Sequence, residues 1–170
     1  MVTLLVLMCL TVHSREEGNG DLLENELRTI ISLKPYAGDE YLELYSMYIN
    51  GGERGKRLAL ADEILAYMKG HASYVSDYRQ VIAVAFDAAN MAVEKSEDYF
   101  VIAEEWIAMA ENAGFSEEDI LKYKVIIAER RGKMELAYKL LGVYLNHCPD
   151  DRYAQKELDY LENRLNLAEP

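Results

Sequence analysis

Few reactive side chains in this sequence stand in a pattern that supports catalysis. The histidines His13, His71 and His147 lack the serine or cysteine and the carboxylate that a nucleophilic triad requires in a recognisable motif. Helix solvation and capping explain the short acidic runs at residues 104–105 and 117–119 more simply than acid–base catalysis does. We therefore expect no catalytic residue and a protein that is not an enzyme.

Metal and phosphate binding have no better support. His147 and Cys148 are adjacent, but no second ligand pair with the spacing of a zinc site accompanies them, and the end of a helix before Pro149 accounts for both. The glycine-rich residues 51–56 have neither the spacing nor the preceding strand of a phosphate-binding loop. We expect no metal site and no cofactor.

The charge of the chain argues against nucleic acid as a partner. The formal net charge is −12, whereas binding to phosphates needs lysines and arginines that displace counterions. The densest basic cluster, Arg54, Lys56 and Arg57, stands beside Glu53 and is typical of the solvated start of a helix. This acidity suits a basic or neutral partner.

The elements that position these side chains are predicted to be helices throughout. About half of the residues are apolar, glycine and proline are sparse, and no stretch alternates in the manner of a strand. Apolar residues recur instead at helical spacing between breaks. The predicted helices span about residues 21–33, 39–50, 54–69, 76–95, 96–113, 119–130, 135–148 and 151–167.

The most informative pattern is the helix punctuation between residues 119 and 151. A helix breaks at Gly132, an alanine follows five positions later at Ala137, and Pro149 ends the next helix seventeen positions after the glycine. This is the punctuation of a helix–turn–helix unit with a period of about 34 residues. Such a unit cannot bury its apolar faces alone, so the pattern predicts stacked neighbours.

On these residues the chain resembles the tetratricopeptide repeat (TPR) family. Residues 84–117 and 118–151 resemble two contiguous repeats, in which Ala103 and Ala137 occupy the small position where paired helices cross. Residues 42–75 resemble a third, degenerate repeat.

The resemblance implies both a fold and a class of function. The expected fold is all-α, with antiparallel helical hairpins stacked as a short right-handed TPR-like α-solenoid, in one domain over residues 21–170 with a C-terminal capping helix at 151–167. The implied function is a non-catalytic scaffold or adaptor that binds a protein or peptide partner. The alternatives are an exported sensory or regulatory module that acts in trans on a peptide or small ligand, and a helical enzyme of unrecognised type.

The family's partner-binding surface is concave and is lined by exposed positions of the first helix of each repeat. A groove of small and mixed side chains there accepts an extended or helical peptide. Some members hold chaperone C-termini with a clamp of lysines and asparagines, which is absent here because Ile126 and Ala88 stand at two of its places. Transferred to this sequence, the surface positions are Glu43, Ser46, Asn50, Ala85, Ala88, Ala92, Lys122, Ile126 and Glu129.

The thirteen tyrosines are the other unusual feature of the composition. Tyr41, Tyr45 and Tyr48 lie at i, i+4 and i+7, on one face of a predicted helix. They are either a core seam with hydroxyls at its rim or an exposed aromatic strip that anchors a partner, and we favour the core. We also expect Trp106 to lie in the core.

The N-terminal residues 1–12 are almost wholly apolar, and the run has about the length of a signal-peptide core and is too short to span a bilayer. Cleavage after Ser14 would leave residues 15–20 as a flexible lead and place the protein in the periplasm or outside the cell. The alternatives are a misplaced start codon or an added apolar helix packed on the solenoid, with a cytoplasmic protein. Loss of Cys9 with the signal leaves Cys148 as the single thiol.

Overall fold

The computed structural model describes residues 20–166, and all regular structure within that range is helical. The chain divides into two compact units, unit 1 up to Ile102 and unit 2 from Ala103 onwards. The predicted signal peptide at residues 1–14, and all but the last residue of the predicted lead, fall outside the described range. No helix among the described residues is long and apolar enough to cross a membrane.

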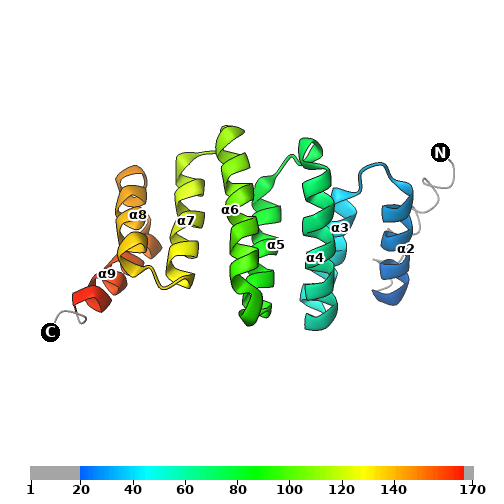
Figure 1. The fold of residues 1–170 in the computed structure, drawn as a ribbon, viewed down its shortest axis with the longest axis horizontal. Helices are drawn as coiled ribbons and strands as arrows, with labels where there is room; N and C mark the ends of the chain where they lie inside the picture. Colours follow the sequence, from blue (N-terminus) through cyan, green and yellow to red (C-terminus); the bar gives the residue numbers. More distant parts are fainter. Residues whose placement is uncertain (1–19, 167–170) are drawn as a thin grey trace. The chain divides into compact units, whose positions relative to one another are not determined.

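In unit 1, the second, third and fourth helices each contact the helix before them in the chain (Figure 1). The boundary between the units falls inside a further helix, α6 (Ser96–Asn112). The elements of unit 1 before α6 are α2 (Gly20–Leu33), α3 (Gly38–Asn50), α4 (Arg54–Gly70), the 3-10 turn η1 (Ala72–Tyr74), α5 (Tyr78–Met91) and the 3-10 turn η2 (Val93–Lys95).

The core of unit 1 consists of the apolar stripes that the helical spacing predicted. Ala61 is fully buried, as expected of the small position at a helix crossing. Each large apolar side chain moved out of water contributes about 1.5–3 kcal/mol to folding. The side chains that are at most 2% exposed include Leu27, Ile30, Leu44, Tyr48, Leu60, Ile64, Met68, Val81 and Ile82.

The three tyrosines of α3 lie in this core, which confirms the favoured prediction. Their rings are at most 6% exposed. Each hydroxyl donates a hydrogen bond to a carboxylate of a different neighbouring helix, so α3 is tied to α4, α5 and α2. The bonds run from Tyr41 to Glu63 (2.9 Å), from Tyr45 to Asp87 (2.5 Å) and from Tyr48 to Glu24 (2.5 Å).

The same pairing shifts the ionisation of these groups. Burial and the hydrogen bond to Glu63 raise the pKa of Tyr41 to about 12. Tyr99 donates to Asp62 at 2.7 Å, and burial together with that bond raises the pKa of Tyr99 to about 12. These hydroxyls therefore stay protonated donors throughout the physiological pH range.

The basic cluster at the start of α4 has structural partners within unit 1. Arg54 donates from Nη2 to the carbonyl oxygen of Met91 at 2.7 Å, which satisfies a carbonyl at the end of α5. Arg57 forms an ion pair with Asp87 at 3.1 Å, and Lys56 pairs with Glu24 at 3.2 Å. The cluster therefore joins α4 to α5 and α2.

The prediction of one helix over residues 76–95 was wrong at its C-terminal end. Asp77 caps α5, and its side chain accepts a hydrogen bond from the backbone of Arg79. However, α5 ends at Met91, because Ala92 leaves the helical region with φ −108° and ψ 71°. In a longer helix the Met91 carbonyl would accept a backbone hydrogen bond from the next turn. The guanidinium of Arg54 donates to it instead, so ending the helix here costs little free energy.

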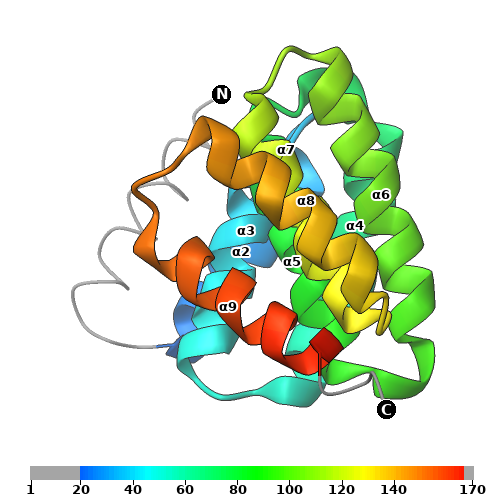
Figure 2. The ribbon, with the colours of Figure 1, turned by 90° about the vertical axis from the view of Figure 1, so that its left-hand side faces the viewer.

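Unit 2 contains the last part of α6 and three further helices, α7 (Glu117–Arg130), α8 (Met134–His147) and α9 (Arg152–Asn166). Helix α8 contacts both α7 and α9, and Figure 2 shows α8 and α9 as neighbours joined by a short turn. Their shared core includes the buried side chains Leu121, Val125, Ala128, Ala137, Leu141, Tyr144, Ala154 and Leu161.

The helix punctuation of unit 2 is confirmed residue by residue. The Ser116 hydroxyl accepts from the backbone N–H of Asp119 at 3.2 Å and caps α7. Gly132 has φ +69°, the left-handed conformation that ends a helix and favours glycine. Ala137 is fully buried where α7 and α8 pack together. Trp106 is 1% exposed and so also lies in the core.

Candidate binding grooves

A groove in unit 2, here called the C-terminal groove, has a volume of about 440 Å³. One wall is the outer face of α7, the opposite wall is the start of α9, and α8 supplies the floor. Its lining residues are Lys122, Val125, Ile126, Glu129, Leu141, Tyr144, Asp151, Tyr153, Ala154 and Glu157.

At one end of the C-terminal groove, the charged side chains pair with one another. The Tyr144 hydroxyl donates to Asp151 at 2.7 Å, and the ammonium of Lys122 lies 3.7 Å from the same carboxylate and 5.0 Å from the centre of the Tyr144 ring. The hydrogen bond from Tyr144 lowers the pKa of Asp151, and the hydrogen bond with Tyr144 raises the pKa of Lys122. The Lys122 charge is therefore already compensated within the groove.

The other end of the C-terminal groove is acidic. Glu129 of α7 and Glu157 of α9 both line it. The Oε1 atom of Glu129 is buried and has no hydrogen-bond partner among the described residues. Burial raises the pKa of Glu129, and the neighbouring Glu157 raises it further, while Arg130 only partly offsets the shift. This end therefore holds two carboxyl groups that share a hydrogen bond, and neither has a cationic partner among the residues that line the groove.

Unit 1 carries a second groove, here called the N-terminal groove, with a volume of about 490 Å³. It runs between α3 and α5, and its rim includes Ile49, which is 45% exposed. The lining residues are Leu42, Tyr45, Ser46 and Ile49 of α3 and Gln80, Ala83, Val84 and Asp87 of α5.

The lining residues of the two grooves share one helical spacing. Their lining residues on α3, α5 and α7 all follow the spacing i, i+3, i+4, i+7, starting at Leu42, Gln80 and Lys122. On α9 the residues Tyr153, Ala154 and Glu157 keep part of this spacing. The helix predicted as a polar cap therefore also serves as the wall of a groove.

The structure brings together only some of the residues predicted for the concave surface. Lys122, Ile126 and Glu129 all line the C-terminal groove, and Ser46 lines the N-terminal groove. Glu43 is half-buried and Asn50 is exposed, and neither is among the residues that line the N-terminal groove.

The three alanines predicted for the middle repeat do not belong to either groove. Ala85 and Ala88 are fully buried, so their assignment to an exposed surface was wrong. Ala92 follows the end of α5 and lines a separate hollow that includes Tyr99 and Leu58.

The error arose from the register of the middle repeat. Helix α7 begins one residue before the predicted repeat 118–151, whereas α5 begins six residues before the predicted repeat 84–117. A shift of five residues rotates a helix face by roughly 140°, which exchanged exposed for buried positions. With the helix starts aligned, Ala83, Asp87 and Asn90 correspond to the predicted residues of α7; Ala83 and Asn90 are exposed and Asp87 is half-buried.

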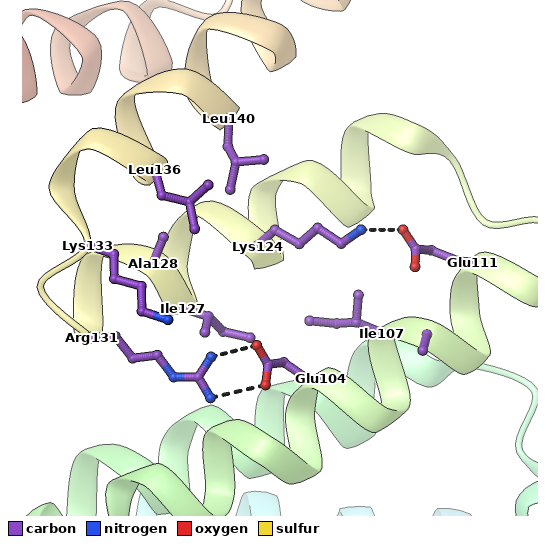
Figure 3. Close-up of a pocket in the computed structure, with 11 residues that line it drawn as sticks. Glu104, Ile107, Glu111, Lys124, Ile127, Ala128, Arg131, Lys133, Leu136 and Leu140 are labelled. Atoms are coloured by element: carbon purple, nitrogen blue, oxygen red, sulfur yellow. Dashed lines mark hydrogen bonds and ion pairs between the residues drawn. The ribbon is translucent and has the colours of Figure 1, made fainter.

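Sequence reasoning missed a further hollow, the α6–α8 pocket, which has a volume of about 360 Å³ (Figure 3). Two ion pairs between α6 and the α7 segment stand at its rim. Arg131 makes two hydrogen bonds to Glu104, at 2.6 and 3.0 Å, and Lys124 pairs with Glu111. The apolar lining is Ile107, Ala108, Ile127, Ala128, Leu136 and Leu140.

One sequence signal for the α6–α8 pocket was available. Leu136 and Leu140 are spaced i, i+4 beside the buried Ala137 and Leu141, so α8 carries a second apolar stripe. Leu136 is 46% exposed, so part of this stripe remains accessible to solvent in the pocket.

The residues first considered for chemistry have ordinary structural partners. Glu104 pairs with Arg131, and Glu117 lies 3.9 Å from the Nε2 atom of His147. Cys148 is a half-buried free thiol after the end of α8. Among the described residues no three metal-binding side chains gather into a possible metal site.

No known protein-family model matches the sequence, and neither does any curated protein. Solved structures do resemble it. The crystal structure of MamA protein aligns with 97% of this chain and 84% of its own at a TM-score of 0.63 and 12% identity. A MamA RS-1 ArsTM double mutant aligns with 95% and 84% at a TM-score of 0.61 and 8% identity.

A tetratricopeptide repeat protein from Parabacteroides merdae ATCC 43184 aligns with 98% of this chain and 75% of its own at a TM-score of 0.48 and 9% identity. At such low identities the two MamA structures bear on the fold alone. Together with the helical hairpins described above, they confirm that this chain has an all-α, TPR-like fold.

Proposed function

We propose that this protein is a non-catalytic scaffold or adaptor that binds a protein or peptide partner in its two grooves. These are the N-terminal groove between α3 and α5 and the C-terminal groove lined by α7, α8 and α9. The observation that carries the proposal is the repeated groove. Units 1 and 2 each present one, lined by residues with the spacing i, i+3, i+4, i+7 on α3 and on α7. A groove that recurs along one side of successive helical repeats is typical of the binding face of a helical-repeat protein.

The grooves have the properties that peptide recognition needs. Apolar side chains remain exposed on their rims, with Ile49 at 45%, Ile126 at 37% and Tyr153 at 87%. Their burial by a partner gains about 25 cal/mol for each Å² of apolar surface. Open grooves between neighbouring helices accept a segment of helix or extended chain, and an exposed aromatic is a common anchor.

The test is affinity capture of partners from the native host with matched variants. Ile126→Asp places a charge in the C-terminal groove. Val143→Asp, on a side chain of α8 that is 42% exposed and lines neither groove, serves as the control. We expect partners to be lost with Ile126→Asp and kept with Val143→Asp, both variants being folded by circular dichroism. Equal recovery with the two variants would refute a role for this groove.

A second function, recognition of a small ligand by a sensory or regulatory module, is favoured by one observation. The α6–α8 pocket has a volume of about 360 Å³, within the size range of small-molecule sites, and combines an apolar floor with a charged rim. A Leu140→Asp variant should abolish ligand-induced thermal stabilisation if this function is correct. Stabilisation by the same ligand in that variant would argue against the pocket.

A further inference from the structure

The acidic end of the C-terminal groove is an incomplete site. The Oε1 atom of Glu129 is buried without a hydrogen-bond partner among the described residues. A buried carboxylate oxygen that is left unpaired destabilises the folded protein, because it has lost its water and gained no donor. Folding alone gives no reason for a charged acceptor to stand there.

The groups around Glu129 do not supply the missing donor. Glu157 lines the groove from α9 and shares a side-chain hydrogen bond with Glu129, but it leaves the Oε1 atom unpaired and adds a second carboxyl group. Arg130 acts on Glu129 only through its charge. Lys122 stands two turns earlier on α7, where Tyr144 and Asp151 hold it. The site therefore needs a positive charge and hydrogen-bond donors from outside.

The walls beside the two carboxylates are suited to the stem of a basic side chain. Val125, Ile126 and Ala154 line the same groove and offer apolar surface to the methylene groups of a lysine or arginine. Tyr153 is 87% exposed at the rim, where its ring can stack on a cation. An apolar channel that ends in acceptors fits an amphipathic cation better than an acid or a purely apolar group.

We propose that the C-terminal groove binds a lysine or arginine side chain of a partner peptide, with the cation held between Glu129 and Glu157. This inference rests on the proposed peptide-binding function and names the chemical class of the partner. The net charge of −12 agrees with it, since an acidic protein attracts a basic segment and hastens its encounter.

The experiment is a selection from a displayed library of random dodecapeptides, followed by affinity measurements. The selection compares the wild-type protein with the double variant Glu129→Gln/Glu157→Gln. The control is Glu135→Gln/Glu162→Gln, which removes two exposed carboxylates outside the groove and so reduces the net negative charge by the same amount. This control separates a site for a cation from general attraction of basic peptides to an acidic protein.

We expect peptides selected on the wild type and on the control to be enriched in lysine or arginine at one position, and the groove variant to lose that enrichment. For one selected peptide, the affinity measured by fluorescence anisotropy should fall about tenfold in the groove variant and less than twofold in the control. Ile126→Asp should also weaken binding, which places the peptide in this groove.

The outcomes separate the two proposals. Selected peptides without an enriched basic position, or equal loss of affinity in both double variants, would overturn the inference while peptide binding itself stands. Failure to select any peptide that responds to Ile126→Asp would overturn both the inference and the proposed function of this groove. Glutamine has nearly the shape of glutamate, so the variant is expected to fold, and thermal unfolding checks this.

Discussion

The hydroxyl of Tyr45 offers a stringent test of how α3 is held in unit 1. Its ring is 4% exposed and its hydroxyl donates to Asp87 at 2.5 Å. A hydrogen bond to a charged group contributes about 1.5–3 kcal/mol. The Asp87 side chain is 30% exposed and keeps its ion pair with Arg57 when the hydroxyl is removed. We therefore expect Tyr45→Phe to lower the free energy of unfolding by about 1–2 kcal/mol.

Urea unfolding followed by circular dichroism measures this loss, and the dependence of the free energy on urea should stay unchanged because the fold is the same. Tyr74→Phe is the control, since Tyr74 is 65% exposed, and it should cost less than about 0.5 kcal/mol. A double-mutant cycle with Asp87→Ala should give a coupling energy of about 1 kcal/mol. A coupling below about 0.3 kcal/mol would show that the bond between Tyr45 and Asp87 does not stabilise unit 1.

Three further predictions concern packing and pH. Ala137→Leu places a larger side chain at the crossing of α7 and α8, and should lower the free energy of unfolding in urea by about 1–3 kcal/mol. An unchanged free energy of unfolding would mean that the site is loosely packed. Because the pKa values of Tyr41 and Tyr99 rise from 10.0 to about 12, stability present below pH 10 should be lost as the pH climbs towards 12, as absorbance titration of the tyrosines can check. Because burial and Glu157 raise the pKa of Glu129 above 4.5, Glu129→Gln should stabilise the protein at neutral pH, and this gain should vanish below pH 4.5. An equal gain in stability at neutral pH and below pH 4.5 would show that the buried charge is not its cause.

Helix boundaries were predictable wherever the signal lies within a few residues of the boundary. Ser116 caps α7 through the third residue after it, and Gly132 ends α7 through its own backbone conformation. The burial of Ala137 and of the α3 tyrosines followed from helical spacing, because three or four residues bring side chains to one face. These features depend on local geometry.

The end of α5 was not predictable in this way. Ala92 has good helix propensity and continues an apolar pattern, so local preference favours a longer helix. The donor that replaces the missing turn is Arg54, which lies 37 residues away in the sequence. The early start of α5 then shifted the register, and Ala85 and Ala88 moved from the predicted surface to the core.

The sequence by itself determined the helical class, the hairpin period and the core stripes, because each follows from spacing along one helix. Only the tertiary structure decided which faces remain open and which charges meet. Glu129 and Glu157 come from different helices, and their repulsion exists only because α8 holds α7 and α9 as the two walls of one groove. Burial removes the water that would otherwise solvate these carboxylates, and no spacing rule along a single helix anticipates that loss.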